Sequence, residues 1–233
     1  MEGHLHILTQ TIRDISLIFD EIGFVPVTGP ELETEFYNFD ALNIPADHPA
    51  RDMQDTFWLK TKEGEDKQVL RTHTSAVQVR YMEERKENPQ AFKIIVPGKV
   101  YRNEATDATH EAQFYQLDGM YVNKTVSMAE LKGVFEYFFK KFLGEDVQMR
   151  FRPSYFAFVE PGVEVDVMRK GKWLEIFGAG LIHPEVMKAG GWNPDEWKGF
   201  AFGGGIDRLV MLRYGIDDVR HLYSGDLRLI NQF

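Results

Sequence analysis

Residues 163–176 read VEVDVMRKGKWLEI, and the class of fold follows from this stretch. Val163–Met168 alternates valine with acidic residues, which is typical of a strand with one buried face, and Lys172–Ile176 predicts a second strand. Lys170-Gly171, between the two, suits the tight turn of a β-hairpin. Because a tight hairpin joins antiparallel neighbours, this stretch predicts an antiparallel sheet.

Further short strands are expected on both sides of this hairpin. They are Phe24–Val27, Thr56–Leu59, Phe92–Val96, Lys99–Arg102, Phe114–Val122 and Val147–Arg152. The expected helices are residues 5–22, a helix capped by Thr74 that runs through Met82, a helix between the capping box Ser127-x-x-Glu130 and Gly144, and Ile206–Tyr214. Strands clustered in this way predict an α+β fold, an antiparallel sheet flanked by helices, rather than a doubly wound parallel sheet.

The composition is that of a globular protein and limits its partners. The 233 residues, with 43% hydrophobic and 27% charged, suit one domain spanning 1–233. The lack of cysteine excludes disulfides and suits a cytoplasmic protein, and no apolar run of about 20 residues predicts a membrane span. A net charge of −9 argues against nonspecific RNA binding by this chain alone, so a partner is expected to supply much of any RNA contact.

A polar hairpin near the middle of the chain carries the first residues with chemical potential. Arg102 and Glu104 lie two positions apart at the end of a predicted strand, so they are expected to point the same way. Arginine can clamp a phosphate, and glutamate can accept from an exocyclic amine. His110 and Phe114, on the returning strand, would add a second cation and an aromatic plate. Together these residues would suit a nucleoside triphosphate; a surface hairpin with a salt bridge is the alternative.

Three adjacent glycines, Gly203 to Gly205, precede the last predicted helix. They would let a ligand approach the backbone closely, and Arg208 would project towards it from the first turn. A tight strand-to-helix connection explains the glycines equally well. The spacing fits neither a dinucleotide fingerprint nor a Walker loop.

In this order, these segments resemble the three signature motifs of class II aminoacyl-tRNA synthetases. The strand that ends at Pro30 resembles motif 1, Arg102-Asn103-Glu104 through Phe114 resembles motif 2, and Gly203-x-Gly205-x-x-Arg208 resembles motif 3. The text between them is similar to the alpha-subunit family of bacterial phenylalanyl-tRNA synthetases in six segments: 48–53, 70–75, 106–110, 151–161, 199–203 and 211–233. The resemblance covers the chain from Gly3 onward.

The resemblance implies an enzyme that joins phenylalanine to ATP as an aminoacyl-adenylate and transfers the acyl group to tRNA(Phe). Such chemistry needs positioning and electrostatic stabilisation rather than a protein nucleophile. By motif match, Arg102 would hold the α-phosphate and the amino acid carboxylate, and Arg208 and His110 would hold the γ-phosphate. Glu104 would accept from the adenine amine, with Phe114 and Arg208 on either side of the ring.

The resemblance also implies an amino acid site. The ammonium and carboxylate of phenylalanine would be held by His73, Ser75, Gln116 and Asp118. Its ring would be lined by Phe156 and Phe158, with Ala201 and Gly203 leaving room at the end of the pocket. Alternate positions in a strand would put the two phenylalanine rings on one side, although a pair of core residues is the simpler interpretation without the family match.

Glu160 matches a family carboxylate that helps hold Mg²⁺, which would bridge phosphate oxygens; a solvent-facing acid before Pro161 is the alternative.

Three residues depart from the family pattern. Asp118 and Asp207 stand where glutamate is usual, and Gln54 replaces an aromatic residue. The N-terminal helical arm of the family is not recognised. A large beta subunit is the expected partner, or a homodimer formed through the first helix and Phe24–Pro30.

Two other functions are compatible with the same residues. One is a synthetase-like paralog that activates an acid for an acceptor other than tRNA. The other is a non-catalytic regulatory or assembly subunit with a degenerate site, against which the intact motif residues argue.

Overall fold

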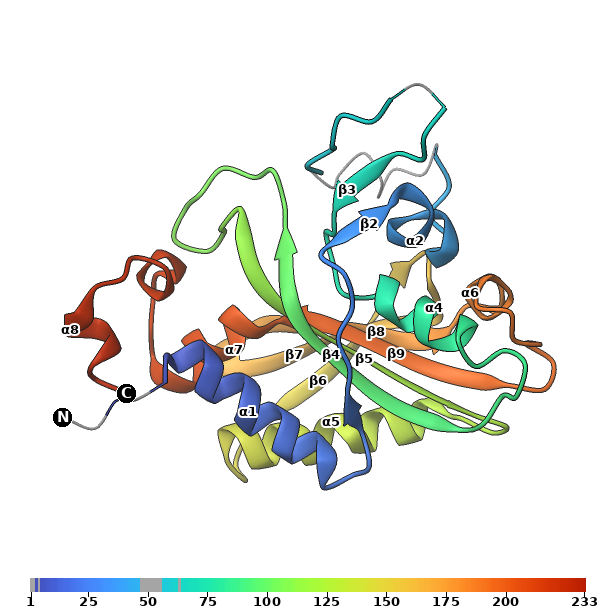
Figure 1. Ribbon diagram of the computed structural model, residues 1–233. Helices are drawn as coiled ribbons and strands as arrows, with labels where there is room; N and C mark the ends of the chain where they lie inside the picture. The colour runs from blue at the N-terminus through green and yellow to red at the C-terminus, as the bar shows by residue number, and fades with distance from the viewer. Residues whose placement is uncertain (1–2, 4, 47–55, 63) are drawn as a thin grey trace.

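The computed structural model describes residues 3, 5–46, 56–62 and 64–233 (Figure 1). Within these residues, seven strands form one sheet in the order β1-β4-β5-β9-β8-β7-β6. All neighbours are antiparallel except β1 and β4. The strands are β1 (Val25–Pro26), β4 (Phe92–Tyr101), β5 (Gln113–Asn123), β6 (Met149–Phe156), β7 (Val159–Arg169), β8 (Lys172–Ile182) and β9 (Lys198–Gly205). The predicted α+β fold is therefore confirmed.

Helices cover both faces of this sheet (Figure 1). On one face lie α1 (Ile7–Asp20) and α5 (Met128–Leu143), and α7 (Ile206–Tyr214) follows β9 and packs against α1. On the other face lie α2 (Glu35–Asn38), η1 (Asp40–Leu42), α4 (Ala76–Glu83), α6 (Pro184–Ala189) and a small sheet of β2 (Leu32–Thr34) and β3 (Gln68–Leu70). Two short elements, η2 (Val219–Leu222) and α8 (Leu227–Ile230), follow α7. Among the described helices, none has the length and apolar character needed to cross a membrane.

Phenylalanine rings dominate the core between the sheet and helices α1 and α5. Phe19 of α1 stacks on Phe138 of α5 at 5.0 Å and on Phe202 of β9 at 5.5 Å between ring centroids. The three side chains are almost fully buried. Such rings bury large apolar areas, so this face of the sheet is closed by packing and is not available for a ligand.

Local signals predicted two features in detail. Ser127 and Glu130 form a complete capping box at the start of α5. Lys170 and Gly171 both adopt positive φ in the turn between β7 and β8, as a tight hairpin turn requires. The hairpin at 163–176 is confirmed, although β8 continues to Ile182.

Other predicted boundaries were wrong. The two strands expected on either side of Pro97-Gly98 are one strand, β4. β4 tolerates the proline because its neighbour β1 pairs with it only at Ile94 and Ile95, so no hydrogen bond to β1 is lost at Pro97. Thr56–Leu59 forms only an isolated bridge, between Trp58 and Val69. Ser75, not Thr74, occupies the N-cap position of α4. Strand β9, helix α6 and the elements after α7 had not been predicted as such.

Candidate active site

A cavity of about 890 Å³ opens on the face of the sheet opposite α1 and α5. This volume suits a small organic ligand or a nucleotide with a second substrate. Its walls come from β5, β8, β9, α7 and the loop between β4 and β5. The predicted site residues that line it are His73, Ser75, Arg102, Glu104, His110, Phe114, Gln116, Asp118, Phe156, Phe158, Ala201, Gly203 and Arg208. Of the predicted set, only Glu160 lies elsewhere.

The register between β5 and β9 builds the floor of the cavity. Asp118 pairs with Gly203, and Gln116 pairs with Gly205. A Cβ on Gly203 would lie 2.0 Å from Asp118 Oδ1, so the absence of a side chain there makes space for the carboxylate. The glycine run therefore does more than connect strand to helix, which answers the alternative left open by the sequence.

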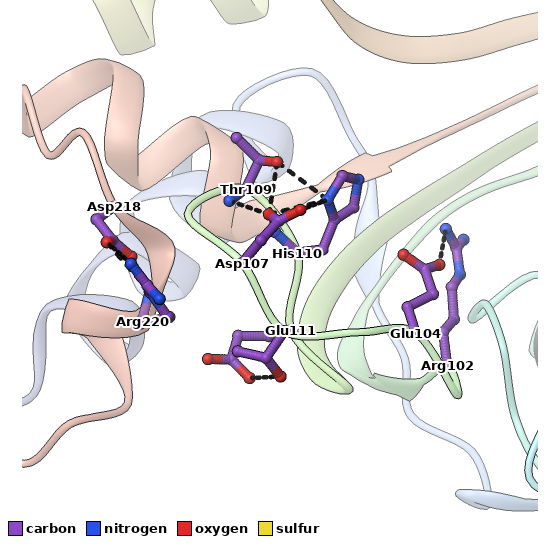
Figure 2. A network of polar contacts seen from close by, with 9 residues as sticks. Arg102, Glu104, Asp107, Thr109, His110, Glu111, Asp218 and Arg220 are labelled. Carbon is purple, nitrogen blue, oxygen red and sulfur yellow. Dashed lines mark hydrogen bonds and ion pairs between the residues drawn. The ribbon is translucent and has the colours of Figure 1, made fainter.

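Arg102 follows β4 directly and carries its guanidinium into the cavity. Its Nε donates to the carbonyl oxygen of Thr72 at 3.2 Å. Its Nη1 lies 3.9 Å from Glu104 Oε1 (Figure 2). Its guanidinium lies 5.1 Å from the ring of Phe114. Burial lowers the pKa of Arg102, because desolvation penalises the cation. A partly desolvated guanidinium with donors to spare is suited to an anionic ligand.

Arg208 approaches the same cavity from the first turns of α7. Its Nη1 donates to the carbonyl oxygen of Glu175 on β8 at 2.9 Å. The Glu175 side chain also lines the cavity, and burial, followed by the charge of Glu164, raises the pKa of Glu175. The sequence pattern did not indicate Glu175, because only the pairing of β8 with β9 brings it beside α7.

The loop between β4 and β5 positions His110 through its own hydrogen bonds (Figure 2). His110 Nδ1 lies 3.0 Å from Asp107 Oδ1, and the same oxygen accepts from the backbone N–H of Thr109 at 2.6 Å. The Thr109 bond and then the His110 bond hold the pKa of Asp107 well below its usual range. An ionised Asp107 therefore fixes this turn and presents the imidazole to the cavity.

Asp118 provides a buried carboxylate at the other end of the cavity. Its Oδ2 accepts from Thr74 twice, from the backbone N–H at 2.9 Å and from the hydroxyl at 2.5 Å. Gln116 Nε2 donates to it at 3.1 Å. Burial raises the pKa of Asp118, although these hydrogen bonds oppose the shift. A cationic ligand group would relieve the desolvation, so this end suits an ammonium. Thr74, which had been expected to cap a helix, donates two hydrogen bonds to this carboxylate instead.

His73 also lines the cavity and is almost fully buried. Its Nε2 bonds to the carbonyl oxygen of Asn38 at 2.9 Å, which fixes the proton on Nε2. Its buried Nδ1 has no partner within the part of the chain that the structure describes. Burial lowers the pKa of His73 to about 4, so the ring is neutral near pH 7.

The depressed pKa of His73 predicts an acid-sensitive fold. Because the unfolded ring would have a pKa of about 6.5, the unfolded chain takes up a proton first as the pH falls. The contribution of the neutral, buried ring to the free energy of unfolding is therefore complete above about pH 6.5 and is lost as the pH falls towards 4. We expect this ring to remove roughly 2 to 3 kcal/mol of the unfolding free energy between pH 7 and pH 4.5. The free energy of unfolding, measured with urea, should depend less steeply on pH in His73→Gln than in wild type. An equal pH dependence in the two proteins would contradict the low pKa assigned to His73.

Two phenylalanine rings form the apolar side of the cavity. Phe156 ends β6, whereas Phe158 lies in the turn that follows, so the expected alternation along one strand was wrong. The rings nevertheless stack, with centroids 5.8 Å apart and planes 24° from parallel. Gly178 of β8 makes space beneath Phe156, since a Cβ there would lie 2.9 Å from the ring. The rest of this end is apolar, lined by Leu42, Ile44, Met120, Ile182, Val186 and Ala201.

Glu160 is not brought to the cavity. It lies at the start of β7 with its side chain 77% exposed, and its Oε2 is 3.6 Å from His183 Nε2. No group of three or more metal-binding side chains is found among the described residues. Gln54 and the segment 48–53, which also carried part of the resemblance, lie outside the described residues.

Comparisons with known proteins show the family of this chain. A family model described as tRNA synthetases class II core domain (F) matches residues 1–233. The phenylalanine–tRNA ligase alpha subunit of Halalkalibacterium halodurans is 49% identical over 245 residues, which cover 100% of this chain and 70% of the relative. Those of Pectobacterium atrosepticum and Bacillus subtilis are 51% and 48% identical, with 99% of this chain and 68% and 69% of the relatives covered. The chain therefore belongs to the class II aminoacyl-tRNA synthetases, in the family of phenylalanine–tRNA ligase alpha subunits.

Proposed function

We propose that this chain is the catalytic alpha subunit, or the catalytic core of that subunit, of an enzyme that activates phenylalanine with ATP and transfers it to tRNA(Phe). The observation that carries the proposal is the shared cavity. Arg102 and Arg208 reach it from different elements, and the stacked rings of Phe156 and Phe158 line its apolar end. The names of the relatives support the same substrates.

In the first step, a carboxylate oxygen of phenylalanine attacks the α-phosphorus of ATP. A new P–O bond forms, the bond to the β-phosphate breaks, and pyrophosphate leaves. Arg102 would donate to the α-phosphate as its charge increases, and Arg208 and His110 would hold the γ-phosphate. Glu104 would accept from the adenine amine, and the ring of Phe114 would stack on the base. Every one of these groups lines the one cavity, so no large movement is needed to assemble them.

The amino acid would be held at the other end of the cavity. Asp118 would accept from its ammonium, and the neutral ring of His73 would line the same end of the site. Gln116 and Ser75 would hold the remaining polar atoms, and its ring would enter between Phe156 and Phe158. Among the described residues, the aliphatic side chains and Ala201 that line the apolar end offer a phenol no hydrogen-bond partner.

Mg²⁺ is proposed as the cofactor, since it neutralises phosphate charge and keeps most of its waters while taking few protein ligands. Glu175 is the carboxylate that we propose for this part, because the residue lines the cavity and its charge interacts with that of Arg208. Glu160, the carboxylate indicated by the resemblance, lies outside the cavity and would have to act on an ion elsewhere.

The proposed partners are tRNA(Phe) and a beta subunit, as expected for an alpha subunit. A homodimer through α1 and β1 is the alternative, and the exposed apolar side chains Leu17 and Val25 lie there. With a net charge of −9, the chain would rely on a partner for much of its RNA contact. The cytoplasm is the proposed location.

ATP–pyrophosphate exchange with a panel of amino acids tests the proposal. Phenylalanine should drive exchange, and tyrosine should be disfavoured by roughly a hundred-fold in kcat/KM because its hydroxyl would be desolvated without a partner. Exchange driven only by another acid would favour the paralog. A folded chain that binds no ATP in calorimetry would favour the regulatory subunit.

A further inference from the structure

The segment after α7 lies against the candidate ATP site and has no role in the function so far. Helix α7 ends at Tyr214, and Gly215 follows in a left-handed conformation with φ 74°. The chain then turns back through η2 and α8 to Phe233, whose ring packs on Tyr214 at 5.0 Å. Figure 1 shows this red segment beside the green loop between β4 and β5.

The first contact joins this segment to the loop that carries His110. The backbone N–H of Val219 donates to the carbonyl oxygen of Ala108 at 2.9 Å. Val219 is the first residue of η2, so its N–H is not needed by the helix. Arg220, paired with Asp218, lies where the charges of Asp107 and Glu111 act on it and, after the Asp218 pair, help to raise its pKa (Figure 2).

The second contact joins the segment to the helix that carries Arg208. The hydroxyl of Tyr223 donates to Oδ1 of Asp207, a buried carboxylate in the first turn of α7. The other oxygen of Asp207 accepts from the backbone N–H of Tyr115 at 2.7 Å. The pairing of β5 with β9 ends at Gln116–Gly205. The side chain of Asp207 therefore accepts from the next backbone N–H of β5, where a residue of β9 would otherwise accept.

One carboxylate therefore fixes two walls of the cavity. Asp207 precedes Arg208 in sequence, and its partner Tyr115 lies between Phe114 and Gln116. The relative placement of Arg208 and Phe114, which would lie on either side of adenine, thus depends on the bonds of Asp207. Burial raises the pKa of Asp207 to about 6, and the bond from Tyr223 is the largest effect opposing that shift.

We propose that residues 216–233 are a structural part of the ATP site, in which Tyr223 is a positioning residue for Arg208 and Val219 fixes the loop that carries His110. The proposal rests on the proposed function for its kinetic consequences only. The segment touches the loop on one side of the triphosphate and the helix on the other, so it holds both in the geometry that ATP binding requires.

Tyr223→Phe, in the full 233-residue chain, removes the hydroxyl and keeps the packed ring. We expect the KM for ATP to rise roughly ten-fold in ATP–pyrophosphate exchange, as the loss of one hydrogen bond to a charged group allows, while the KM for phenylalanine changes much less. Tyr137→Phe is the matched control, because Tyr137 also donates to a carboxylate, that of Glu21, on the closed face of the sheet. Equal kinetics for the two variants would overturn the proposal.

The pH profile separates positioning from a general loss of stability. Asp207 faces Tyr223, the backbone of Tyr115 and the charge of Glu111. Removing the hydroxyl raises the pKa of Asp207 further, so the ionised form needs a higher pH. The Tyr223→Phe defect in KM for ATP should therefore be larger at pH 6.5 than at pH 8.5 when each is measured against wild type. A defect that does not change with pH would contradict the role given to this bond.

The first contact, the bond from Val219 to Ala108, has a test that needs no enzymatic activity. Val219→Pro removes the N–H, whereas Val219→Ala keeps it and trims the side chain; proline suits the first position of a helix. Hydrogen exchange of amides 103–112 should be several-fold faster in Val219→Pro than in Val219→Ala. Equal exchange would overturn the proposal even if the enzyme is active. Altered exchange in a chain inactive with every amino acid would instead refute the proposed function alone.

Discussion

Replacing Arg102 with glutamine is expected to lower kcat/KM for ATP–pyrophosphate exchange by about a thousand-fold, as removal of a principal charge-stabilising donor does. The charge on the α-phosphate increases towards the transition state, so the guanidinium contributes more there than in the bound ground state. The loss should fall mainly on kcat.

The position of Arg102 explains why no neighbour can replace it. Its backbone leaves β4 at the start of the loop, and Nε is fixed by the carbonyl oxygen of Thr72. The remaining donors face the cavity beside Phe114 and Glu104. Arg208 is tied to the carbonyl oxygen of Glu175 on the opposite wall. Arg102→Lys should recover little, since an ammonium cannot reproduce a planar fork.

Arg85→Gln is the matched control for the loss of one positive charge. Arg85 lies after α4 and stacks on the ring of Tyr81 at 3.5 Å, outside the cavity lining. It should exchange pyrophosphate at the wild-type rate. If Arg102→Gln retained activity within ten-fold of this control, Arg102 could not be the group that stabilises the α-phosphate.

Local signals in the sequence were sufficient for much of the fold, whereas the candidate site residues came largely from the family resemblance. The turn at Lys170-Gly171 and the box at Ser127 and Glu130 involve neighbours in sequence, so their geometry follows from residue type. Gln116 and Asp118 alternate along one strand, which places them on one face whatever the remaining topology. The family match then supplied their expected roles.

What could not be predicted depends on contacts between distant segments. Glu175 enters the cavity only because β8 pairs with β9 beside α7. Thr74 could cap a helix or serve Asp118, and the choice depends on a strand 44 residues away. Phe158 reaches Phe156 through a turn rather than along a strand. The role of Tyr223 depends on Asp207, which bonds to β5 just beyond the point where the pairing of β5 with β9 ends. No local sequence pattern marks that point.

The second large effect is expected from a substitution in the glycine run Gly203 to Gly205, whose three positions are not equivalent. A Cβ on Gly203 would meet Asp118 Oδ1 at 2.0 Å and Gln116 Nε2 at 3.3 Å. Asp118 has little room to withdraw, because both bonds from Thr74 hold its other oxygen. At Gly205 the nearest atom to an added Cβ is Arg208 Cβ at 3.9 Å, an ordinary contact.

Gly203→Ala should therefore raise the KM for phenylalanine by about a hundred-fold, because the displaced carboxylate loses its charge-assisted bond to the ammonium. ATP binding, measured by calorimetry, should remain within a few-fold of wild type, since Arg102 and Arg208 are untouched. Gly205→Ala adds the same methyl group two residues away and should keep the KM for phenylalanine close to wild type. A Gly203→Ala enzyme with unchanged phenylalanine affinity would mean that Asp118 does not bind the substrate ammonium, and that the buried carboxylate serves only to hold Thr74 and β5 together.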